Sequence, residues 1–298
     1  SAAAARARRG PRSGLGAALI AAALAMIAAL AGAFTMPVLD RDEARFAQAT
    51  AQMLESGDPV RIRFLDQPRH KKPAGIHWMQ AMSVGALSSD QAREIWAYRL
   101  PSVLGAGLAA FAVTLLGRAL IGGRAGFAGG LLIAVSVLLS AEGGIAKTDA
   151  MLAGLTAITM LAVVRVRLSA DEDAPPSRLS TRSWAILAWA AAATAILVKG
   201  PVTPMVVGLA MLALVVWERR IAWLKPFFFW PGPVLAAALL IPWFAAVQLV
   251  TEGAFLAEAL GQDLGPKLVS GHEGHGAPPG AHLALLPVLA FPMIVILP

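Results

Sequence analysis

The sequence of 298 residues contains no cysteine and few charged residues. Without cysteine, the chain has neither a disulfide framework nor a thiolate metal site. Charged residues make up 14% of the chain and hydrophobic residues 57%, with a mean hydropathy of +0.67. That balance excludes an ordinary soluble globular domain and places the chain among membrane proteins.

Acidic residues are the scarcer charge, because 25 Lys and Arg face 18 Asp and Glu, for a net charge of +7. A basic balance of this kind also occurs in nucleic-acid-binding proteins. Here the basic residues fall in short clusters between apolar spans rather than along an aromatic-studded soluble face. We therefore expect no nucleic-acid partner, and we expect membrane lipid headgroups or phosphorylated lipids as the anionic partners.

Long apolar runs dominate the chain, and a spanning helix needs about 20 mainly apolar residues. Eight segments approach that length: 14–37, 98–121, 125–141, 149–166, 183–198, 201–217, 227–250 and 281–298. The first follows four arginines like a signal peptide, but its apolar part is longer than the roughly 7–15 residues of such a peptide, so we expect a retained anchor. The expected fold class is all-α, a polytopic transmembrane helical protein.

The basic residues of the loops indicate an orientation, because Lys and Arg are retained on the cytoplasmic side. An N-terminus inside makes 38–97 a large outer loop with amphipathic helices and 251–280 a second outer loop. Spans two to seven then lie within 98–250. The chain begins with Ser and stops inside the apolar run 281–298, so we expect cut ends and a truncated eighth span.

The first outer loop begins with the charged stretch "VLDRDEARFAQ". Asp40 and Glu43 are spaced as a capping box for a helix that runs to Ser56 before Gly57. Within that helix Phe46 belongs to an apolar stripe that is suited to lying along the membrane surface.

Asp42 and Arg45 lie three residues apart on this helix and therefore share a face. Asp42 is a candidate functional carboxylate. The alternative is structural: an acid in the first turn is favoured by the helix dipole and pairs with an arginine.

A basic cluster follows in "PRHKKPAGIHWMQAM". Arg69, His70, Lys71 and Lys72 are adjacent and repel one another, so they favour an anion, and Pro73 suits the first turn of the next helix. One interpretation is contact with anionic lipid headgroups. The functional interpretation is a clamp for a phosphate or pyrophosphate.

Two smaller sites are expected at the same membrane face. In "IAKTDAML", Lys147 and Asp149 stand where a spanning helix begins, although an acid there is also a helix cap. In "LVKGP", Lys199 ends a long uncharged run. A lysine at a helix end is favoured because it reaches the interface, which is the alternative to a functional role.

The second outer loop contains "GHEGHGAPPGAH". His272, Glu273 and His275 are candidate ligands of a divalent metal. The alternative is that these residues bind substrate.

The candidate residues share one location, because this topology brings Asp42, Lys72, Asp149, Lys199 and His275 to a single membrane face. A transporter more often carries ionisable residues or broken helices at mid-membrane depth, within repeats. Here the span centres are nearly free of charge, and we find no internal repeat. The pattern favours chemistry at the interface, on a substrate with a polar head and a lipid tail.

The motifs resemble those of a known family. The pattern D-E-x-R-F-A at 42–47, then "MLESGD", "KKP", "AKTDAML", "VKGP" and "GHEGHGAPP", resembles GT-C glycosyltransferases in matching order over nearly the whole chain. The most similar group contains the aminoarabinose lipid A transferases and their protein O-mannosyltransferase relatives. Family members usually continue into further spans and a soluble C-terminal domain, which is absent from this sequence.

The resemblance implies an inverting inner-membrane enzyme that moves a sugar from a polyprenyl-phosphate carrier to lipid A, a protein or a glycan at the periplasmic face. It implies that Asp42 is the catalytic carboxylate and that Lys72, Arg45 and Lys199 bind the donor phosphate. Supporting or substrate-binding roles are expected for Glu43, Lys71, His70, Asp149, Lys147, His275 and Glu273. These types suit the chemistry, because a carboxylate takes the acceptor proton while cations stabilise the departing phosphate.

One position departs from the aminoarabinose group. There an acid precedes the key lysine, as in "EKP", and belongs to a metal site, whereas here that position is Lys71. A cation disfavours a metal, so no cofactor is required and a divalent metal at His275 and Asp149 remains an alternative. Two other functions fit the same residues: a flippase for polyprenyl-linked lipid, and a membrane scaffold.

Overall fold

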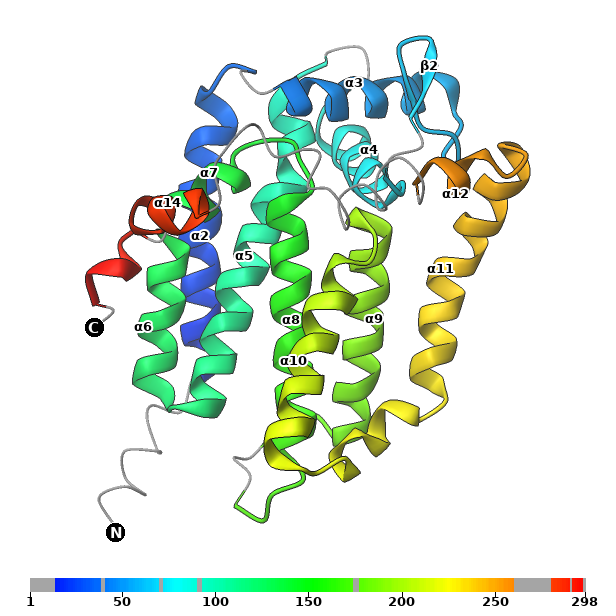
Figure 1. Cartoon of the computed structure of the whole chain (residues 1–298). Coiled ribbons are helices and arrows are strands. Elements are labelled where there is room, and N and C mark those ends of the chain that lie inside the picture. Colours follow the sequence, from blue (N-terminus) through cyan, green and yellow to red (C-terminus); the bar gives the residue numbers. More distant parts are fainter. Residues whose placement is uncertain are drawn as a thin grey trace.

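The computed structural model describes residues 14–38, 41–69, 72–89, 93–173, 177–259, 280–289 and 291–296. The described chain is a helical bundle with one small two-stranded ribbon (Figure 1). Its helices that are long and apolar enough to cross a membrane are α2 (Gly14–Thr35), α5 (Ile95–Leu120), α8 (Asp149–Leu168), α9 (Thr181–Lys199) and α11 (Pro231–Val250). The expected all-α, polytopic fold class is confirmed.

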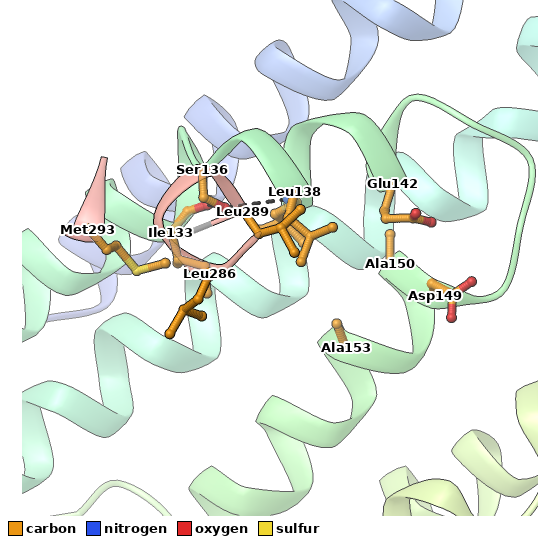
Figure 2. A pocket seen from close by; sticks show the side chains of 11 residues that line it. Ile133, Ser136, Leu138, Glu142, Asp149, Ala150, Ala153, Leu286, Leu289 and Met293 are labelled. Carbon is orange, nitrogen blue, oxygen red and sulfur yellow. Dashed lines mark hydrogen bonds between the residues drawn. The ribbon is translucent and has the colours of Figure 1, made fainter. Parts of the chain in front are cut away.

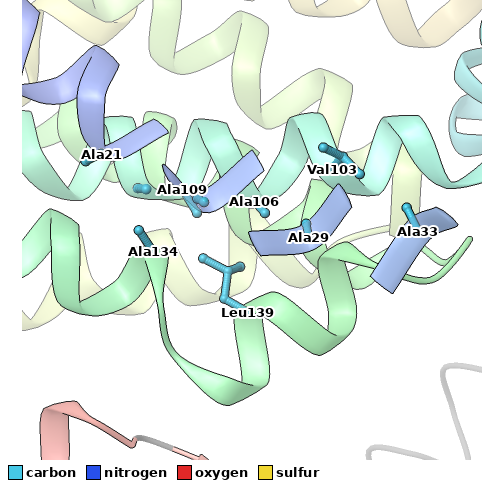
Figure 3. Packing of buried hydrophobic residues seen from close by; sticks show 10 residues of the cluster. Ala21, Ala29, Ala33, Val103, Ala106, Ala109, Ala134 and Leu139 are labelled. Carbon is cyan, nitrogen blue, oxygen red and sulfur yellow. The ribbon is translucent and has the colours of Figure 1, made fainter. Parts of the chain in front are cut away.

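The packing of α2 depends on alanines spaced four residues apart. Ala21, Ala25, Ala29 and Ala33 are all buried and form one cluster with residues of α5, α6 and α7 (Figure 3). Residues at this spacing lie on one helix face. Small side chains on that face let helix backbones approach closely, which is the main source of helix association in lipid.

Helices α5 and α8 approach even more closely, at two glycines. A Cβ at Gly105 would lie 2.4 Å from the backbone nitrogen of Met151, and a Cβ at Gly154 would lie 2.5 Å from the carbonyl oxygen of Gly105. Neither position has space for a side chain. The contact fixes the start of α8, where Asp149 lies, against the central helix α5.

The expected span 125–141 is interrupted. It consists of α6 (Gly123–Ala134) and α7 (Val137–Gly143), which meet at a bend of 57°. Ser136 caps the second helix, since its hydroxyl accepts a hydrogen bond from the Leu139 amide at 3.4 Å. A cap of this kind starts a new helix, so a continuous run of apolar residues does not ensure a continuous helix.

The expected spans at 201–217 and 281–298 also differ from long helices. Helix α10 (Val202–Glu218) is apolar but has 17 residues, and it is followed by the 3-10 helix η1 (Ala222–Phe228). The last segment contains α14 (Ala281–Leu289), of nine residues, and the 3-10 helix η3 (Met293–Ile296). Over its described residues this segment is therefore not a continuous span, and α14 lies beside α7 (Figure 1).

The segment between α2 and α5 forms a layer across one end of the bundle (Figure 1). It contains α3 (Arg41–Ser56), the ribbon of β1 (Arg63–Phe64) and β2 (Gln67–Pro68), and α4 (Gly75–Leu87). The short helix α12 (Ala254–Glu258) joins it from the end of α11. We refer to residues 41–87 as the outer layer.

The expectation that the apolar stripe of α3 lies on the membrane surface is corrected. Ala49 and Met53 pack in one buried cluster with Leu197 of α9, Trp243 of α11 and Phe255 of α12. The stripe faces protein because α4 returns beneath α3 and the helix ends of the bundle meet it there. The outer layer is thus held rigidly against the bundle.

Candidate active site

Asp42 and Arg45 occupy the outward side of the first turn of α3. Their side chains pair at 3.5 Å, between Arg45 Nη1 and Asp42 Oδ1, and both are partly exposed. The Arg45 guanidinium also lies 5.9 Å from the centre of the Phe64 ring in the ribbon. The carboxylate is therefore accessible, and the cation beside it, Arg45, also contacts the Phe64 ring.

Glu43 points to the opposite side and is fully buried. It forms a two-pronged ion pair with Arg99 of α5, at 2.7 Å and 2.9 Å, and it also accepts the Ala146 amide at 2.8 Å. Arg99 donates further to the carbonyls of Ala33 and Met36 at the end of α2. Glu43 is thus part of a buried network, since the ion pair ties α3 to three other segments. The expected capping box is not tested, because its partner Asp40 lies outside the described residues.

Lys72 lies just before α4, above the buried ring of Phe46. Its ammonium nitrogen is 5.0 Å from the ring centre, and the Arg69 guanidinium carbon lies at the same distance. Cations over an aromatic face are attracted by the ring quadrupole. One aromatic side chain of α3 thus holds two cations of the following loop.

Four charges surround Lys72. Burial is the main reason that the pKa of Lys72 lies below its usual value of 10.5, and the positive charge of Lys199 is the next cause. Asp149 and Asp42 act in the opposite direction, while Arg69 adds repulsion. Charges act on a pKa only over short distances. The charges of Asp42, Asp149 and Lys199 therefore lie within electrostatic reach of Lys72.

Lys199 and Asp149 form an ion pair in which both side chains are partly buried. Lys199 is the last residue of α9, and Gly200 follows with a positive φ of 76° that the turn requires. Asp149 is the first residue of α8. The pair joins two helix ends directly below the outer layer, so Lys199 reaches the site from a helix terminus.

The Phe46 ring rests on a buried polar group. His77 stacks on it at 5.5 Å, and the Thr50 hydroxyl lies 2.7 Å from His77 Nδ1 and donates to Gln80 Oε1 at 2.6 Å. Because that hydroxyl donates to Gln80, it accepts from Nδ1–H of a neutral imidazole. Burial, with Arg69 and Lys72 nearby, lowers the pKa of His77 to about 3.

An apolar cavity of about 580 Å³ reaches this site. It is lined by side chains of α6, α7, α8, α14 and η3, and Figure 2 shows Glu142 and Asp149 gathered at one end and Leu286, Leu289 and Met293 at the other. Its size is typical of a small-molecule pocket. Asp149 therefore belongs both to the cavity wall and to the group of charges around Lys72.

Several predicted site residues are not tested by these contacts. His70 and Lys71 lie outside the described residues, and so do His272, Glu273 and His275. Lys147 lies half-buried in the turn before α8, where its carbonyl accepts a hydrogen bond from Ser102 at 3.1 Å. Within the described ranges no three His, Asp or Glu side chains form a group able to hold a metal. Asp149 is engaged by Lys199, so the described residues do not form a metal site.

Two residues were missed as site components. Phe46 was expected on the membrane surface, but its ring holds Lys72 together with Arg69, a member of the predicted basic cluster. Arg99 lies at the start of a predicted span, where an isolated charge is costly and needs a partner. The cost of burying Arg99 therefore indicates that an acid lies beside it. It does not identify that acid as Glu43, which is 56 residues away.

The arrangement combines an accessible carboxylate, paired with Arg45, and two cations, Lys72 and Arg69, that lie over the Phe46 ring. Arg and Lys side chains bind phosphate oxygens, and Arg does so with two parallel donors. A carboxylate within the same site can accept a proton from an attacking hydroxyl. The geometry suits transfer of a group from a phosphate to an acceptor.

Comparison with known proteins identifies relatives over most of the chain. A family model described as dolichyl-phosphate-mannose-protein mannosyltransferase matches residues 71–245. An undecaprenyl phosphate-alpha-4-amino-4-deoxy-L-arabinose arabinosyl transferase of Pseudomonas fluorescens is 27% identical over 209 residues, which is 70% of this chain and 36% of that protein. The enzyme of the same name from Pseudomonas aeruginosa strain UCBPP-PA14 is 30% identical over the same shares. The chain thus spans about a third of the length of these curated relatives.

Solved structures share the fold. The crystal structure of ArnT from Cupriavidus metallidurans in the apo state has a TM-score of 0.79 and 22% identity, covering 95% of this chain and 50% of that one. The structure of the same protein bound to undecaprenyl phosphate has a TM-score of 0.70, also at 22% identity, and covers 80% and 43% of the two chains. Together with the apolar helices, these relatives show an integral membrane protein.

Proposed function

Because the chain belongs to the dolichyl-phosphate-mannose-protein mannosyltransferase family, we propose that it transfers a sugar from a polyprenyl-phosphate carrier to an acceptor hydroxyl. The single observation that carries the proposal is the placement of Lys72. Its ammonium sits on the Phe46 ring beside Arg69, within the electrostatic reach of Asp42. A donor phosphate bound there lies next to the one accessible carboxylate of the first turn of α3.

In the proposed reaction, the bond between the anomeric carbon of the sugar and the phosphate oxygen breaks, and a new bond forms to the acceptor oxygen. Asp42 takes the proton of the acceptor hydroxyl. The electron pair of the broken bond leaves with the polyprenyl phosphate, whose charge is stabilised by Lys72, Arg69 and Arg45. Attack from the side opposite the leaving phosphate inverts the anomeric centre.

Lys199 has an indirect part in this proposal. It is paired with Asp149 and adds positive charge near Lys72. In this ion pair the charge of Lys199 is balanced by that of Asp149 at the end of the cavity. Lys72 is then nearer to the donor phosphate than Lys199 is. We assign Lys199 and Asp149 to positioning rather than to proton transfer.

The relatives guide the choice of donor and location. Two proteins similar to this chain are named as undecaprenyl phosphate aminoarabinose transferases, and a structure with the same fold holds undecaprenyl phosphate. We propose an undecaprenyl-type carrier in a bacterial inner membrane. The positive-inside rule supports a site on the periplasmic face, because Arg118, Arg165 and Arg219 lie toward the other end of the bundle.

The test is a transfer assay on the full-length protein with a radiolabelled polyprenyl-phosphate sugar, in which released polyprenyl phosphate and labelled acceptor are both counted. Asp42→Asn is expected to lower the rate about 10²- to 10⁴-fold, as for loss of a general base. Asp58→Asn is the matched control, because Asp58 pairs with Arg61 in the same layer at 3.6 Å with the same i, i+3 spacing. Movement of the labelled lipid across a vesicle without release of polyprenyl phosphate would instead identify a flippase, and equal rates in all variants would remove the proposed site.

A further inference from the structure

Arg165 stands near the end of α8 that lies farthest from the outer layer, three residues before the helix ends at Leu168. Its side chain lies 5.9 Å from the ring centre of Trp184 on α9. Its Nε and Nη1 atoms are buried, and neither has a hydrogen-bond acceptor among the described residues. Buried donors of this kind are rare, because almost all such groups in native proteins have a partner.

A second arginine adds positive charge at the same place. Arg118 lies two residues before the end of α5, close enough to repel Arg165. Its guanidinium packs against the start of α2, since a Cβ at Gly14 would lie 2.6 Å from Arg118 Nε. The ends of α5 and α8 and the start of α2 therefore lie around the two positive charges of Arg118 and Arg165.

The neighbouring Arg167 shows how a compensated arginine looks in this region. Arg167 donates to Glu218 at 2.6 Å and to Asp171 at 2.9 Å. Residues two apart on a helix point in different directions, so Arg165 does not reach these acids. Acidic residues are thus present at this end of the bundle, but they serve Arg167 and not Arg165.

Glu172 and Asp173 are exposed acids of the same linker as Asp171, and neither accepts a hydrogen bond from the buried Nε or Nη1 of Arg165. Residues 1–13 contain four arginines and no Asp or Glu, and residues 174–176 are Ala-Pro-Pro. The excess positive charge is therefore a property of the chain itself.

From this geometry we infer that Arg165 and Arg118 form a binding site for a phosphate group, at the end of the bundle opposite the candidate active site. A guanidinium donates charge-assisted hydrogen bonds to phosphate oxygens, and Nε and Nη1 of Arg165 are two such donors without an acceptor among the described residues. Basic pockets between membrane helices bind the headgroups of anionic lipids. The phosphate belongs either to such a headgroup or to a free phosphate ion. The inference is independent of the proposed transfer reaction.

The experiment measures bound anion on the full-length protein, purified in a neutral detergent, by native mass spectrometry. Phosphatidylglycerol, phosphatidylcholine and inorganic phosphate are added in separate arms. We expect phosphatidylglycerol or inorganic phosphate to bind the wild type, and Arg165→Gln and Arg118→Gln each to weaken that binding about tenfold or more, which corresponds to 1.4 kcal/mol. Binding of the lipid alone identifies a headgroup site, and binding of inorganic phosphate that displaces the lipid identifies a free-phosphate site.

Arg124→Gln is the matched control, because Arg124 is an exposed arginine at the same end, in the first turn of α6. It removes the same charge without touching the pair. Arg165→Lys and the thermal midpoint of each variant verify that the protein is folded, and Arg118→Gln keeps the test valid if Arg165→Gln unfolds. Binding by Arg165→Gln and Arg118→Gln at the wild-type level would overturn the inference. An equal loss in Arg124→Gln would do the same, since it would indicate general attraction to the basic surface.

Discussion

The inward and outward sides of α3 hold adjacent acidic residues in opposite environments. Glu43 is fully buried and satisfied by Arg99 and the Ala146 amide. Asp42 is partly exposed and forms an ion pair at 3.5 Å with Arg45, three residues further along the same helix. Two consecutive residues therefore differ in role: the Glu43 carboxylate is structural, and the Asp42 carboxylate is accessible.

The difference teaches how the site is built. The buried pair fixes the rotation of α3 against α2, α5 and the start of α8, since its hydrogen bonds reach all of these segments. That rotation leaves Asp42 partly exposed on the outward side, within electrostatic reach of Lys72. Positioning by rigid elements is what a catalytic group needs to act at a defined distance.

The largest expected effect comes from breaking the inward side. Glu43→Gln leaves the Arg99 guanidinium buried without a counter-charge, and loss of one partner of a buried ion pair costs about 3–5 kcal/mol. The free energy of unfolding, measured by denaturant or heat in detergent, should fall by that amount. Asp42→Asn should change it by less than about 1 kcal/mol, because exposed ion pairs contribute little. Equal losses in the two variants would contradict the division between the two sides.

A smaller effect is expected from a change of Phe46, whose ring lies between the inward and outward sides of α3. Phe46→Leu keeps an apolar side chain but removes the aromatic face below Lys72 and Arg69. We expect polyprenyl phosphate to bind roughly 2- to 30-fold more weakly, which corresponds to a loss of about 0.5–2 kcal/mol of cation–π attraction. Phe64→Leu is the control, since that ring is 5.9 Å from Arg45 and does not contact Lys72 in the described contacts. An unchanged affinity in Phe46→Leu would show that the ring is only core.

The smallest expected effect concerns His77, which stacks on the Phe46 ring, and it is a dependence of stability on pH. His77 has a pKa of about 3 in the folded protein and 6.5 as its ordinary value. Between these values the unfolded chain binds a proton that the folded chain excludes, so stability falls as pH drops below 6.5. At pH 5.5, one unit below the ordinary pKa, the loss is about 1.4 kcal/mol. Thermal midpoints from pH 7.5 to 5 should fall less steeply in His77→Gln, and parallel curves would contradict a neutral buried imidazole.

Much of the fold follows from composition. Long apolar runs with few charges predict a polytopic helical protein, and this class is confirmed. The break between α6 and α7 was not predicted, because hydropathy is continuous over 125–141 while the cap formed by Ser136 is a local hydrogen bond. The short helices of 281–298 were missed for a similar reason, since apolar content measures solubility in lipid and not helix continuity.

The candidate site was predictable only where its residues belong to a local pattern. Asp42, Arg45 and Lys72 stand in motifs of one outer loop, and the alternation of spans predicts that Asp149 and Lys199 lie at the same membrane face. The Glu43–Arg99 pair joins residues 56 positions apart, and no local spacing predicts such a contact. The support of Phe46 by His77 depends on α4 folding back under α3, which is a tertiary contact as well.

The most direct test of the account is the binding of polyprenyl phosphate to the full-length protein as a function of pH. The Lys72 ammonium holds the phosphate in this account, and its pKa is lowered below 10.5 in the free protein. Affinity should therefore fall as pH rises through that lowered pKa, and Lys72→Arg should keep its affinity to a higher pH because arginine stays charged. Lys72→Met should bind weakly at every pH. Wild-type affinity in Lys72→Met, with the same pH dependence, would contradict the assignment of Lys72 and the site built around it.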